Sequence, residues 1–372
     1  RVLAFGTYDG AVDGKPLAHG IRPLGFLLLA NPIRKTAPET FAYFAKQGVE
    51  VKVISGDNPV TVSNVAREAG IDHAEAYVDA SQLRSDEELR EAVLHNTVFG
   101  RVTPDQKRKF VQALKEAGHT VAMTGDGVND VLALKQADCS VAMAAGSDAA
   151  RNVAQLVLVD NDFAAMPKVV AEGRRSINNL QRSASLFLVK TLLSMTLAVL
   201  FILLPWQYPF QPIQMTLISA FTIGLPSFVL ALEPNKDRIK GRFLENVIVK
   251  SIPGAICAVL TILIVNTVGY NVLHLDYEHV STLCVLLTAW IGALLIVRLS
   301  IPFTPIRAAL LVVVVGGTVL GATVLHGLFG IEPFTFGMTV LFTVLAIGVT
   351  GLFHVLFGIF DAWHAKRLAN MV

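Results

Sequence analysis

One short segment of the chain brings two carboxylates and an amide within a few residues of each other. In Thr124–Asp130, the side chains of Asp126, Asn129 and Asp130 surround a Gly-Val pair. Carboxylate oxygens are hard ligands that suit Mg²⁺, directly or through the waters of its shell. A Gly-Asp-Gly turn is more often only a turn, so this segment becomes a candidate site only together with others.

A second group of residues supplies donors for a phosphoryl group. Ser55, Gly56 and Asp57 follow an apolar run, and Lys107 comes shortly after Arg101. The Lys107 ammonium is a point charge for one phosphoryl oxygen, and the Ser55 hydroxyl with neighbouring backbone N–H groups donates to another. Because phosphoryl transfer depends mainly on positioning and charge neutralisation, the combined set predicts a phosphate and metal site.

Alternating strands and helices are predicted around these residues. Strands are expected over 24–30 (buried), 49–54, 98–99 and 120–123, and helices over 36–47, 59–69 and 104–117. This alternation predicts a parallel α/β sheet. Ser55 and Asp126 each follow a predicted strand, and ligands in such sheets bind beyond the carboxyl ends of the strands.

The composition of the whole chain excludes several classes of protein. Of 372 residues, 53% are hydrophobic and only 16% are charged, against roughly 25% charged in soluble domains. This apolar content excludes general disorder. A net charge of +2 without a basic stripe argues against a nucleic-acid partner. Three cysteines, two of them in apolar runs, exclude a secreted disulfide scaffold.

The charged residues divide the chain into a soluble half and a membrane half. Residues 1–184 hold 21 Lys and Arg and 22 Asp and Glu, whereas 185–372 hold 10 and 7. Six apolar stretches follow, each near the ~20 residues of a membrane helix. They cover 185–204, 213–232, 247–269, 280–299, 306–326 and 334–358. Six in succession disfavour buried helices of a soluble protein, so an integral, multi-pass protein in contact with the lipid bilayer is predicted.

In the fifth stretch, Gly316, Gly317 and Gly321 are expected to allow close helix packing.

The basic residues of the loops predict an orientation. Lys and Arg occur in 233–246, in 298–307 and after Trp363, and they are absent from 205–212, 270–279 and 327–333. By the positive-inside rule, the first set of loops is cytoplasmic. The α/β domain and the C-terminus are therefore expected on the cytoplasmic side as well.

One lysine stands out within the first predicted span. Lys190 has no acidic residue between 185 and 232 to pair with. An intramembrane charge is a functional hypothesis by default; the alternative is that its side chain reaches the interface from near the helix end. In the second span, the break at Gly224–Pro226 would free a backbone carbonyl for a ligand or a water-filled cavity. Hydroxyls that could share a transport site with the lysine are those of Thr191, Ser194, Ser219 and Thr222.

Four motifs together resemble those of the P-type ATPases. Thr124–Asp130 matches the hinge motif and Phe99–Lys107 resembles the arginine–proline–lysine segment. Ser55–Asp57 resembles Thr-Gly-Asp with Ser for Thr, and Asn31–Arg34 resembles Asp-Pro-x-Arg with Asn for the acid. The resemblance is strong over about residues 1–235, and beyond that it rests on the number of membrane helices. It implies a partial haloacid-dehalogenase-like phosphorylation domain of the Rossmann type, followed by an all-α bundle of six transmembrane helices.

The resemblance also implies a role for each site residue, with ATP and Mg²⁺ as substrate and cofactor. Asp126 would bind Mg²⁺; Lys107, Ser55, Gly56 and Asp57 would hold the phosphoryl group; Asn129 and Asp130 would complete that pocket; Arg101 and Arg34 would contact nucleotide. Residues 1–23 would end the nucleotide-binding domain, and 24–162 would form the phosphorylation domain. Residues 163–204 would form one stalk and membrane helix of ~60 Å, able to transmit rotation of the phosphorylation domain. Residues 205–372 would form the other five membrane helices.

The nucleophile motif of that family does not occur in this sequence. The family carries its phosphorylated acid in Asp-Lys-Thr-Gly-Thr, which is absent from the 372 residues. Because the first residue is Arg, the chain is expected to be a fragment or a processed product. The actuator domain, most of the nucleotide domain and the first four membrane helices of the family also lack counterparts, so the resemblance implies the C-terminal portion of a pump, partnered by the N-terminal portion and inactive alone. Without the nucleophile strand the sheet would lack a central member, so the soluble half is expected to be poorly stable by itself.

The transported substrate stays open at this point. No carboxylate lies within the six predicted spans, so no divalent-ion site made of several carboxylates is visible. Lys190 is expected to act as a built-in counter-cation. The leading interpretation is an ATP-driven cation pump of a bacterial plasma membrane. The alternatives are a lipid or polyamine translocase, a phosphatase-like domain on a membrane anchor that is not a pump, and a truncated non-catalytic membrane protein.

Overall fold

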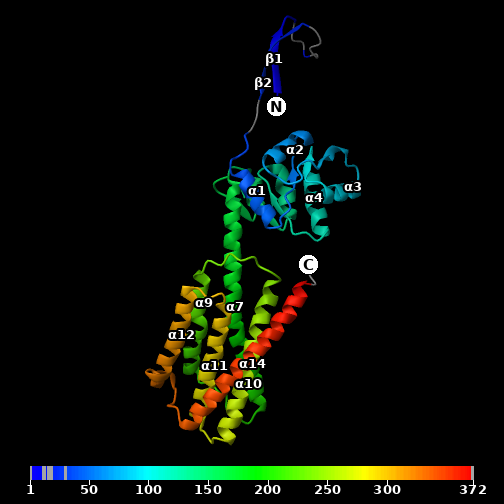
Figure 1. Ribbon diagram of the computed structural model, residues 1–372. Helices are drawn as coiled ribbons and strands as arrows, with labels where there is room; N and C mark the ends of the chain where they lie inside the picture. The colour runs from blue at the N-terminus through cyan, green and yellow to red at the C-terminus, as the bar shows by residue number, and fades with distance from the viewer. Residues whose placement is uncertain (1, 11–13, 15–19, 29–31, 370–372) are drawn as a thin grey trace. The chain divides into compact units, whose positions relative to one another are not determined.

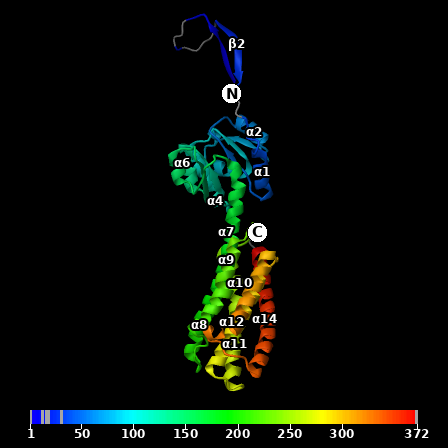
Figure 2. The same ribbon diagram turned by 90° about the vertical axis from the view of Figure 1, so that its left-hand side faces the viewer.

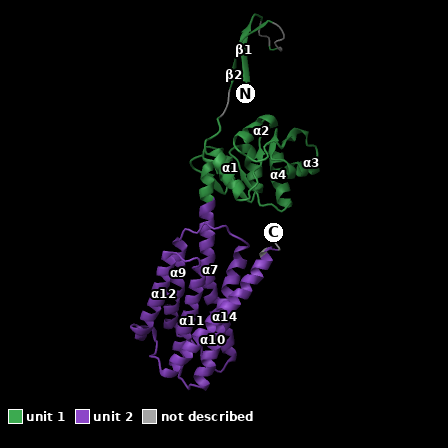
Figure 3. Ribbon diagram, viewed as in Figure 1, with its two compact units in different colours: residues 1–169 green, residues 170–372 purple. Residues whose placement is uncertain are grey.

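The computed structural model describes residues 2–10, 14, 20–28 and 32–369. The chain forms two compact units, residues 1–169 and residues 170–372, which Figure 3 colours separately. Residues 29 and 30 of the predicted strand 24–30 lie outside the described residues, as does Asn31 of the Asn-Pro-x-Arg motif.

The first unit begins with a two-stranded hairpin whose apolar side chains are exposed. β1 (Val2–Tyr8) pairs antiparallel with β2 (Ile21–Leu28). The prediction of a buried strand over 24–30 was wrong in its burial, since Phe26 and Leu28 are 67% and 75% exposed. An apolar run indicates a strand, but its burial depends on the segment that covers it, and β2 pairs with β1 alone among the described residues.

The rest of the first unit contains two separate three-stranded parallel sheets. Their strand orders are β3-β5-β4 and β6-β7-β8. The strands are β3 (Val53–Ile54), β4 (Tyr77–Asp79), β5 (Val98–Gly100), β6 (Ala122–Thr124), β7 (Cys139–Met143) and β8 (Leu156–Leu158). The predicted parallel α/β class is confirmed. The predicted sheet is divided in two, however, with β3 and β6 as edge strands in the part of the chain that the structure describes.

Helices flank these sheets and begin at recognisable sequence signals. They are α1 (Ala37–Lys46), α2 (Pro59–Glu68), α3 (Asp86–His95), α4 (Pro104–Glu116), α5 (Val131–Gln136) and α6 (Asp148–Val153), with 3-10 turns at η1 (Ala80–Gln82), η2 (Val128–Asp130) and η3 (Phe163–Ala165). The Asn58 side chain accepts from the Val60 N–H at the start of α2, and Thr103 and Gln106 form a capping box at the start of α4. The three helices predicted in this region are confirmed to within one residue at each end.

Helix α4 packs against both sheets and joins their cores. Phe110 contacts Phe99 of β5 in one core, with ring centroids 4.7 Å apart. The next residue, Val111, belongs to the other core with Met123 of β6 and Ala142 of β7. Because consecutive helical residues point about 100° apart, one helix can fill two cores at once. The two sheets are therefore held together through α4.

A single helix of 38 residues, α7 (Met166–Leu203), begins in the first unit and continues into the second (Figure 1). At 1.5 Å per residue it is ~57 Å long. It contains the first of six helical segments that are long and apolar enough to cross a membrane: 163–203, 212–232, 243–271, 277–299, 305–323 and 336–367. The six predicted spans are therefore confirmed, and most of the helices extend beyond the apolar stretches.

The second span is irregular. It consists of α8 (Pro212–Ile218), a π-helical turn η4 (Ser219–Gly224) and α9 (Leu225–Leu232). Pro226 has no N–H to continue the α-helical ladder, and a π turn is one way in which a helix absorbs that interruption. The predicted break at Gly224–Pro226 is thus a local change of helix type at the level of Ser219 and Thr222.

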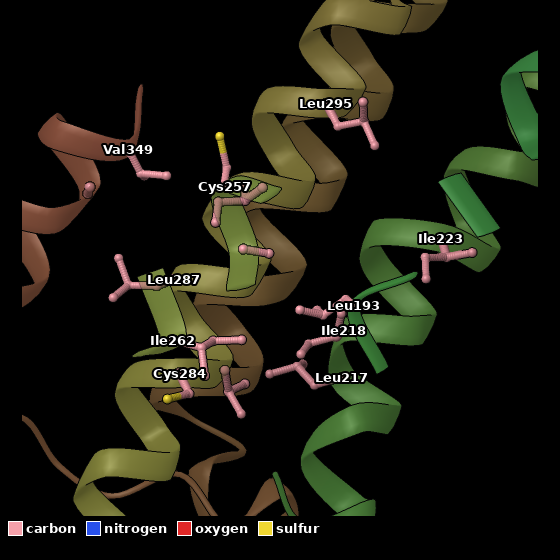
Figure 4. Packing of buried hydrophobic residues seen from close by; sticks show 14 of the residues in the cluster. Leu193, Leu217, Ile218, Ile223, Cys257, Ile262, Cys284, Leu287, Leu295 and Val349 are labelled. Atoms are coloured by element: carbon pink, nitrogen blue, oxygen red, sulfur yellow. The ribbon is translucent and has the colours of Figure 1, made fainter. Parts of the chain in front are cut away.

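The remaining helices pack side by side in the second unit (Figures 1 and 2). They are α10 (Phe243–Asn271), α11 (Tyr277–Leu299), α12 (Pro305–Thr323), a short α13 (His326–Phe329) and α14 (Phe336–Ala369). Figure 4 shows Cys257 and Ile262 of α10 beside Cys284 and Leu287 of α11, with Leu217 and Ile218 of α8 in the same core. Helix α11 contacts α8, α10, α12 and α14, which makes it central to the bundle.

Close packing of the second and fifth spans depends on two glycines of α12. A Cβ atom at Gly317 of α12 would overlap the ring of Phe221, and one at Gly321 would overlap Leu217. By contrast, a Cβ at the neighbouring Gly316 would meet nothing within 4 Å. The predicted role in close packing is therefore confirmed for Gly317 and Gly321 and does not apply to Gly316.

We predict that Gly317→Ala destabilises the bundle, whereas Gly316→Ala does not. Both substitutions gain the helix propensity of alanine, about 1 kcal/mol. The difference in stability between the two variants therefore measures the clash with Phe221. Overpacking of this kind costs about 1–3 kcal/mol. Thermal unfolding midpoints of the two variants, measured side by side in the same detergent, test the prediction. Equal midpoints would contradict it.

Candidate functional site

The central contact of the site in the first unit is an ion pair between Lys107 and Asp130. Lys107 lies in the first turns of α4, and its Nζ is 2.6 Å from Oδ1 of Asp130, at the end of η2. The two side chains are 13% and 10% exposed. The other oxygen of Asp130, Oδ2, accepts a hydrogen bond of 3.1 Å from the Gly127 N–H. Asp130 thus links helix α4 to the turn at Gly127.

The turn after β6 is held from its backbone and leaves the Asp126 side chain exposed. The Gly125 N–H donates to the Val141 carbonyl, and the Asp126 carbonyl accepts from the Ser147 N–H at 2.7 Å. A Cβ atom at Gly125 would overlap the side chain of Asp130, so this position requires glycine. The carboxylate of Asp126 and the amide of Asn129 are both exposed. Asp126 is therefore presented to solvent from a fixed turn.

The segment after β3 is joined by hydrogen bonds to the segment after β5. The Ser55 carbonyl accepts from the Val102 N–H at 3.0 Å, and the Asp57 carbonyl accepts from the Arg101 N–H at 2.8 Å. Arg101 has a φ of 53°, which directs the chain from β5 towards Thr103, the first cap residue of α4. The Ser55 hydroxyl accepts from the Asp57 N–H at 3.1 Å.

A continuous series of contacts therefore runs between the two predicted halves of the site. It passes from Ser55 to Val102, from there into α4, and from Lys107 of α4 to Asp130. The structure brings Lys107 and Asp130 into direct contact, and it holds the Ser55 and Arg101 turns against each other. These links join the carboxyl ends of β3, β5 and β6, where ligands of parallel sheets bind.

Two arginines predicted to contact nucleotide are engaged elsewhere in the first unit. Arg101 Nη1 is 2.8 Å from Asp79 Oδ2, and Arg34 Nη1 is 3.5 Å from Asp162 Oδ1. The Ser81 hydroxyl, and then Arg101, hold the pKa of Asp79 below its ordinary value. Both guanidinium groups are more than half exposed, so these pairs are weak surface contacts.

The described residues supply only part of a magnesium site. No group of three or more His, Cys, Asp or Glu among them could hold a metal ion. Asp130 is already paired with Lys107, which leaves the exposed carboxylate of Asp126 as a ligand. Mg²⁺ is commonly held by one or two carboxylates together with waters and substrate phosphates. Asp126 therefore fits a magnesium site that other groups complete.

In the second unit, the structure brings Lys190 of α7 into contact with Ser219. Lys190 Nζ donates to Ser219 Oγ at 2.6 Å, and Ser219 Oγ donates to the Met215 carbonyl at 2.6 Å. Ser219 begins the π-helical turn of the second span. The lysine thus lies half-buried between two spans, at the point where one of them is irregular.

The other predicted membrane residues do not join that contact. Thr191 is exposed and bonds back to the Phe187 carbonyl, and the buried Thr222 bonds back to the Ile218 carbonyl at 2.7 Å. Ser194 shares a hydrogen bond with Tyr208, in the loop after α7. Burial raises the pKa of the Tyr208 hydroxyl. Thr191, Ser194 and Thr222 are therefore satisfied within their own surroundings.

A buried cluster at one end of the second unit was not predicted from sequence. Glu233, directly after α9, lies 2.9 Å from Arg182 of α7 and 2.7 Å from Arg307 of α12, and all three side chains are at most 11% exposed. Burial alone would raise the pKa of Glu233, but the two guanidinium groups hold it below its ordinary value. Asn179 of α7 also donates to the Glu233 carbonyl at 2.8 Å. The only sequence signal was that Glu233 lies at the start of a loop rich in basic residues.

The expectation that the spans contain no carboxylate needs a correction. The helices are longer than the apolar stretches, and they include Glu245, Glu278 and Asp361 near their ends. The central parts of the six helices contain none. A second lysine, Lys250, lies inside α10 and was overlooked beside Lys190.

Comparison with known proteins agrees with both units. The haloacid dehalogenase-like hydrolase family matches residues 5–138. The probable cation-transporting ATPase exp7 of Streptococcus pneumoniae is 44% identical over 305 residues, which is 80% of this chain and 39% of the relative. The calcium-transporting ATPase CtpE of Mycolicibacterium smegmatis is 48% identical over 267 residues, 69% of this chain and 34% of the relative. The chain belongs to the P-type ATPase family.

More distant members of this P-type ATPase family match a similar share of the chain. Calcium-transporting ATPase 1 of Bacillus cereus is 36% identical over 241 residues, 63% of this chain and 27% of the relative. The chain thus spans between about a quarter and two fifths of the length of these relatives.

We predict that Lys107→Ala destabilises the first unit far more than Lys109→Ala on the same helix. Removing Lys107 leaves the buried carboxylate of Asp130 without its cation, which costs about 3–5 kcal/mol. Lys109 makes an exposed pair with Asp86, 2.8 Å away, which adds little stability because solvent screens it. Hydrogen exchange of peptides from α4 and β6, compared between the variants, measures the difference. Equal protection in both would show that the ion pair is dispensable.

Proposed function

We propose that this chain is the C-terminal portion of an ATP-driven P-type pump that moves a cation across a bacterial plasma membrane through an aspartyl-phosphate intermediate. The relatives supply the coarse part of the proposal, since they are named as cation- or calcium-transporting ATPases. The portion of the pump and its chemistry follow from the geometry of the first unit.

The observation that carries the proposal is the division of the sheet at β3 and β6. Each of these edge strands leads directly into a candidate segment, β3 into Ser55 and β6 into Asp126. One further parallel strand between them would join the two sheets into one. A residue at the carboxyl end of that strand would then lie between Ser55 and Asp126. This is the position that a phosphorylated carboxylate needs, and no Asp-Lys-Thr-Gly occurs in the 372 residues.

The residues of the chain would divide the work of phosphoryl transfer as follows. Lys107, fixed by Asp130, would neutralise one phosphoryl oxygen, and Ser55 with the backbone N–H groups around Gly56 and Asp57 would donate to another. Asp126 would hold Mg²⁺, which when bound neutralises charge on the phosphates. Asn129 is exposed beside Asp126 and would complete the pocket.

The proposal includes partners beyond this chain. The strand between β3 and β6 would come from the N-terminal portion of the same pump, and so would part of the nucleotide site. Arg101 and Arg34 are exposed enough to exchange their carboxylate partners for the phosphates of ATP. The first unit and the C-terminus would be cytoplasmic. The loops on their side of the spans hold the Lys and Arg residues, and the loops on the other side hold none.

We propose a cation as the transported substrate, and Ca²⁺ as the first ion to test, because relatives 48% and 36% identical are named as calcium-transporting. The names of the relatives favour this over a lipid or polyamine. Lys190 would act as a fixed positive charge beside the transport path. Its contact with Ser219, at the π-helical turn, supports that role over a lysine that only reaches the interface.

We predict that the purified 372-residue chain forms no acid-stable phosphoenzyme with labelled ATP and Mg²⁺, whereas the complete pump does. In the complete pump, Asp126→Asn should slow phosphorylation by about 100-fold, as for loss of a group that orients a metal. Asp72→Asn, an exposed carboxylate on the same unit, serves as the matched control. Phosphoenzyme on the chain alone would refute the proposed division of the catalytic site.

We predict that Lys190→Ala in the complete pump changes the charge moved in each transport cycle by about one elementary charge, the value of one lost ammonium. Lys190→Arg should retain the wild-type value, and Lys250→Ala, a second lysine in a span, should also leave it unchanged. Reconstituted vesicles with a voltage-sensitive dye and an ion tracer report charge and ion together. Unchanged stoichiometry and rate in Lys190→Ala would remove the lysine from the transport site.

A further inference from the structure

The C-terminal helix α14 is attached to the start of α10 through a histidine. His364 Nε2 lies 2.8 Å from Asn246 Oδ1, and its Nδ1 lies 3.8 Å from Glu245 Oε1. The His364 and Glu245 side chains are only 16% and 13% exposed. Arg367 Nε is 2.9 Å from the same Glu245 oxygen. These four residues connect the last two turns of α14 to the first turn of α10.

The hydrogen bonds of Asn246 determine which nitrogen of His364 carries a proton. The Asn246 amide donates from Nδ2 to the Lys240 carbonyl at 2.8 Å, so its Oδ1 is the atom that faces His364. An oxygen there can only accept, and His364 Nε2 must therefore be the donor. In the neutral ring, Nδ1 then carries no proton, and its lone pair can only accept a hydrogen bond.

Two acceptor atoms at this contact lack a hydrogen bond, and a single proton placed between them would supply it. Among the described residues, His364 Nδ1 and Glu245 Oε1 are both buried without a hydrogen bond, and they face each other. Arg367 is within ion-pair distance of Glu245 but does not have the alignment of a hydrogen bond to that oxygen. A proton on Nδ1 would turn two unsatisfied acceptors into a charge-assisted hydrogen bond after a small approach.

We infer that His364 and Glu245 form a proton-binding site that fastens the end of α14 to α10. With the proton bound, the imidazolium bridges Asn246 and Glu245. Without it, a lone pair faces a carboxylate, and the contact is held by Asn246 and by Arg367, whose side chain is 49% exposed. Because the imidazolium makes one hydrogen bond more than the neutral ring, the fastening strengthens as the pH falls.

The surrounding charges are consistent with this assignment. On α14, Asp361 pairs with Arg298 of α11, so it is not available to His364. Besides Arg298 and Arg367, α10, α11 and α14 carry the cations Lys250 and Lys366, for which no ion pair is seen among the described residues. Glu245 is therefore the carboxylate that this histidine can use, and its remaining charge is shared with Arg367 alone.

Hydrogen exchange of the complete protein in lipid nanodiscs tests the inference. Peptides from the end of α14 are compared at about pH 6 and about pH 8, on either side of the ordinary range of histidine titration, after correction for the chemical exchange rate. In the wild type we expect about threefold slower exchange at the lower pH, the factor of one modest ion pair. His354→Gln, on the same helix three turns earlier, should retain that dependence.

Two substitutions at the site should abolish the pH dependence by different routes. His364→Gln keeps a donor for Asn246 but cannot take up a proton, so exchange should be equal at both pH values. Glu245→Gln introduces an amide that donates to the neutral ring, so protection should persist at the higher pH. If His364→Gln or Glu245→Gln retains the wild-type dependence, or if the wild type shows none, the inference is overturned.

Discussion

The ion pair between Lys107 and Asp130 fixes the geometry on which the proposed phosphate site depends. Lys107 comes from the helix that fills both cores of the first unit, and Asp130 ends the turn that presents Asp126. One oxygen of Asp130 faces the lysine and the other accepts from Gly127, so the carboxylate sets the turn against α4. A buried pair of this kind is costly unless both partners are present. The effect of the ion pair here is to fix the relative position of two strand ends rather than to add net stability.

Unpaired strand edges explain several features of the first unit together. The hairpin of β1 and β2 exposes Phe26 and Leu28, and the two parallel sheets end at β3 and β6. An uncovered edge exposes backbone N–H and C=O groups that pair readily with another strand. Ser55 and Asp126, to which the proposed function assigns phosphate chemistry, follow these same edges. Completing the sheet and completing the site would therefore be a single event, which is why the proposal treats the missing nucleophile and the missing strand as one segment.

Much of the fold could be predicted from the sequence because its signals are local. The start of α2 at Asn58 and Pro59 and the start of α4 at Thr103 are written in neighbouring residues. The six spans follow from unbroken apolar runs. Burial of β2 could not be predicted in the same way, since it depends on whether another segment covers the strand.

The candidate residues were named from their motifs, and the contacts among them were not predicted. Lys107 and Asp130 were both candidates from their motifs, yet nothing in either motif indicates that they pair with each other. The clusters around Glu233 and His364 were not predicted at all. Glu233 and Arg307 are 74 residues apart, and His364 and Asn246 are 118 apart, so no local pattern connects them. Such partners follow from the packing of helices, which the apolar runs do not determine.

The polar groups of the second unit limit where the specificity for an ion can lie. Ser219 already accepts from Lys190 and donates to Met215, so a cation bound to its remaining lone pair would lie beside the Lys190 ammonium. Glu233, the acid nearest to the second span, is held by two arginines. Ca²⁺ in proteins takes six to eight oxygen ligands, usually with carboxylates among them. The central parts of the six helices hold no carboxylate, so if the proposed pump carries Ca²⁺, the carboxylate ligands would not come from there. The part of the path built here would then contribute backbone carbonyls at the π-helical turn and one fixed positive charge. That charge would oppose a second cation beside Lys190, so the described half of the path would limit how many ions are bound rather than which ion.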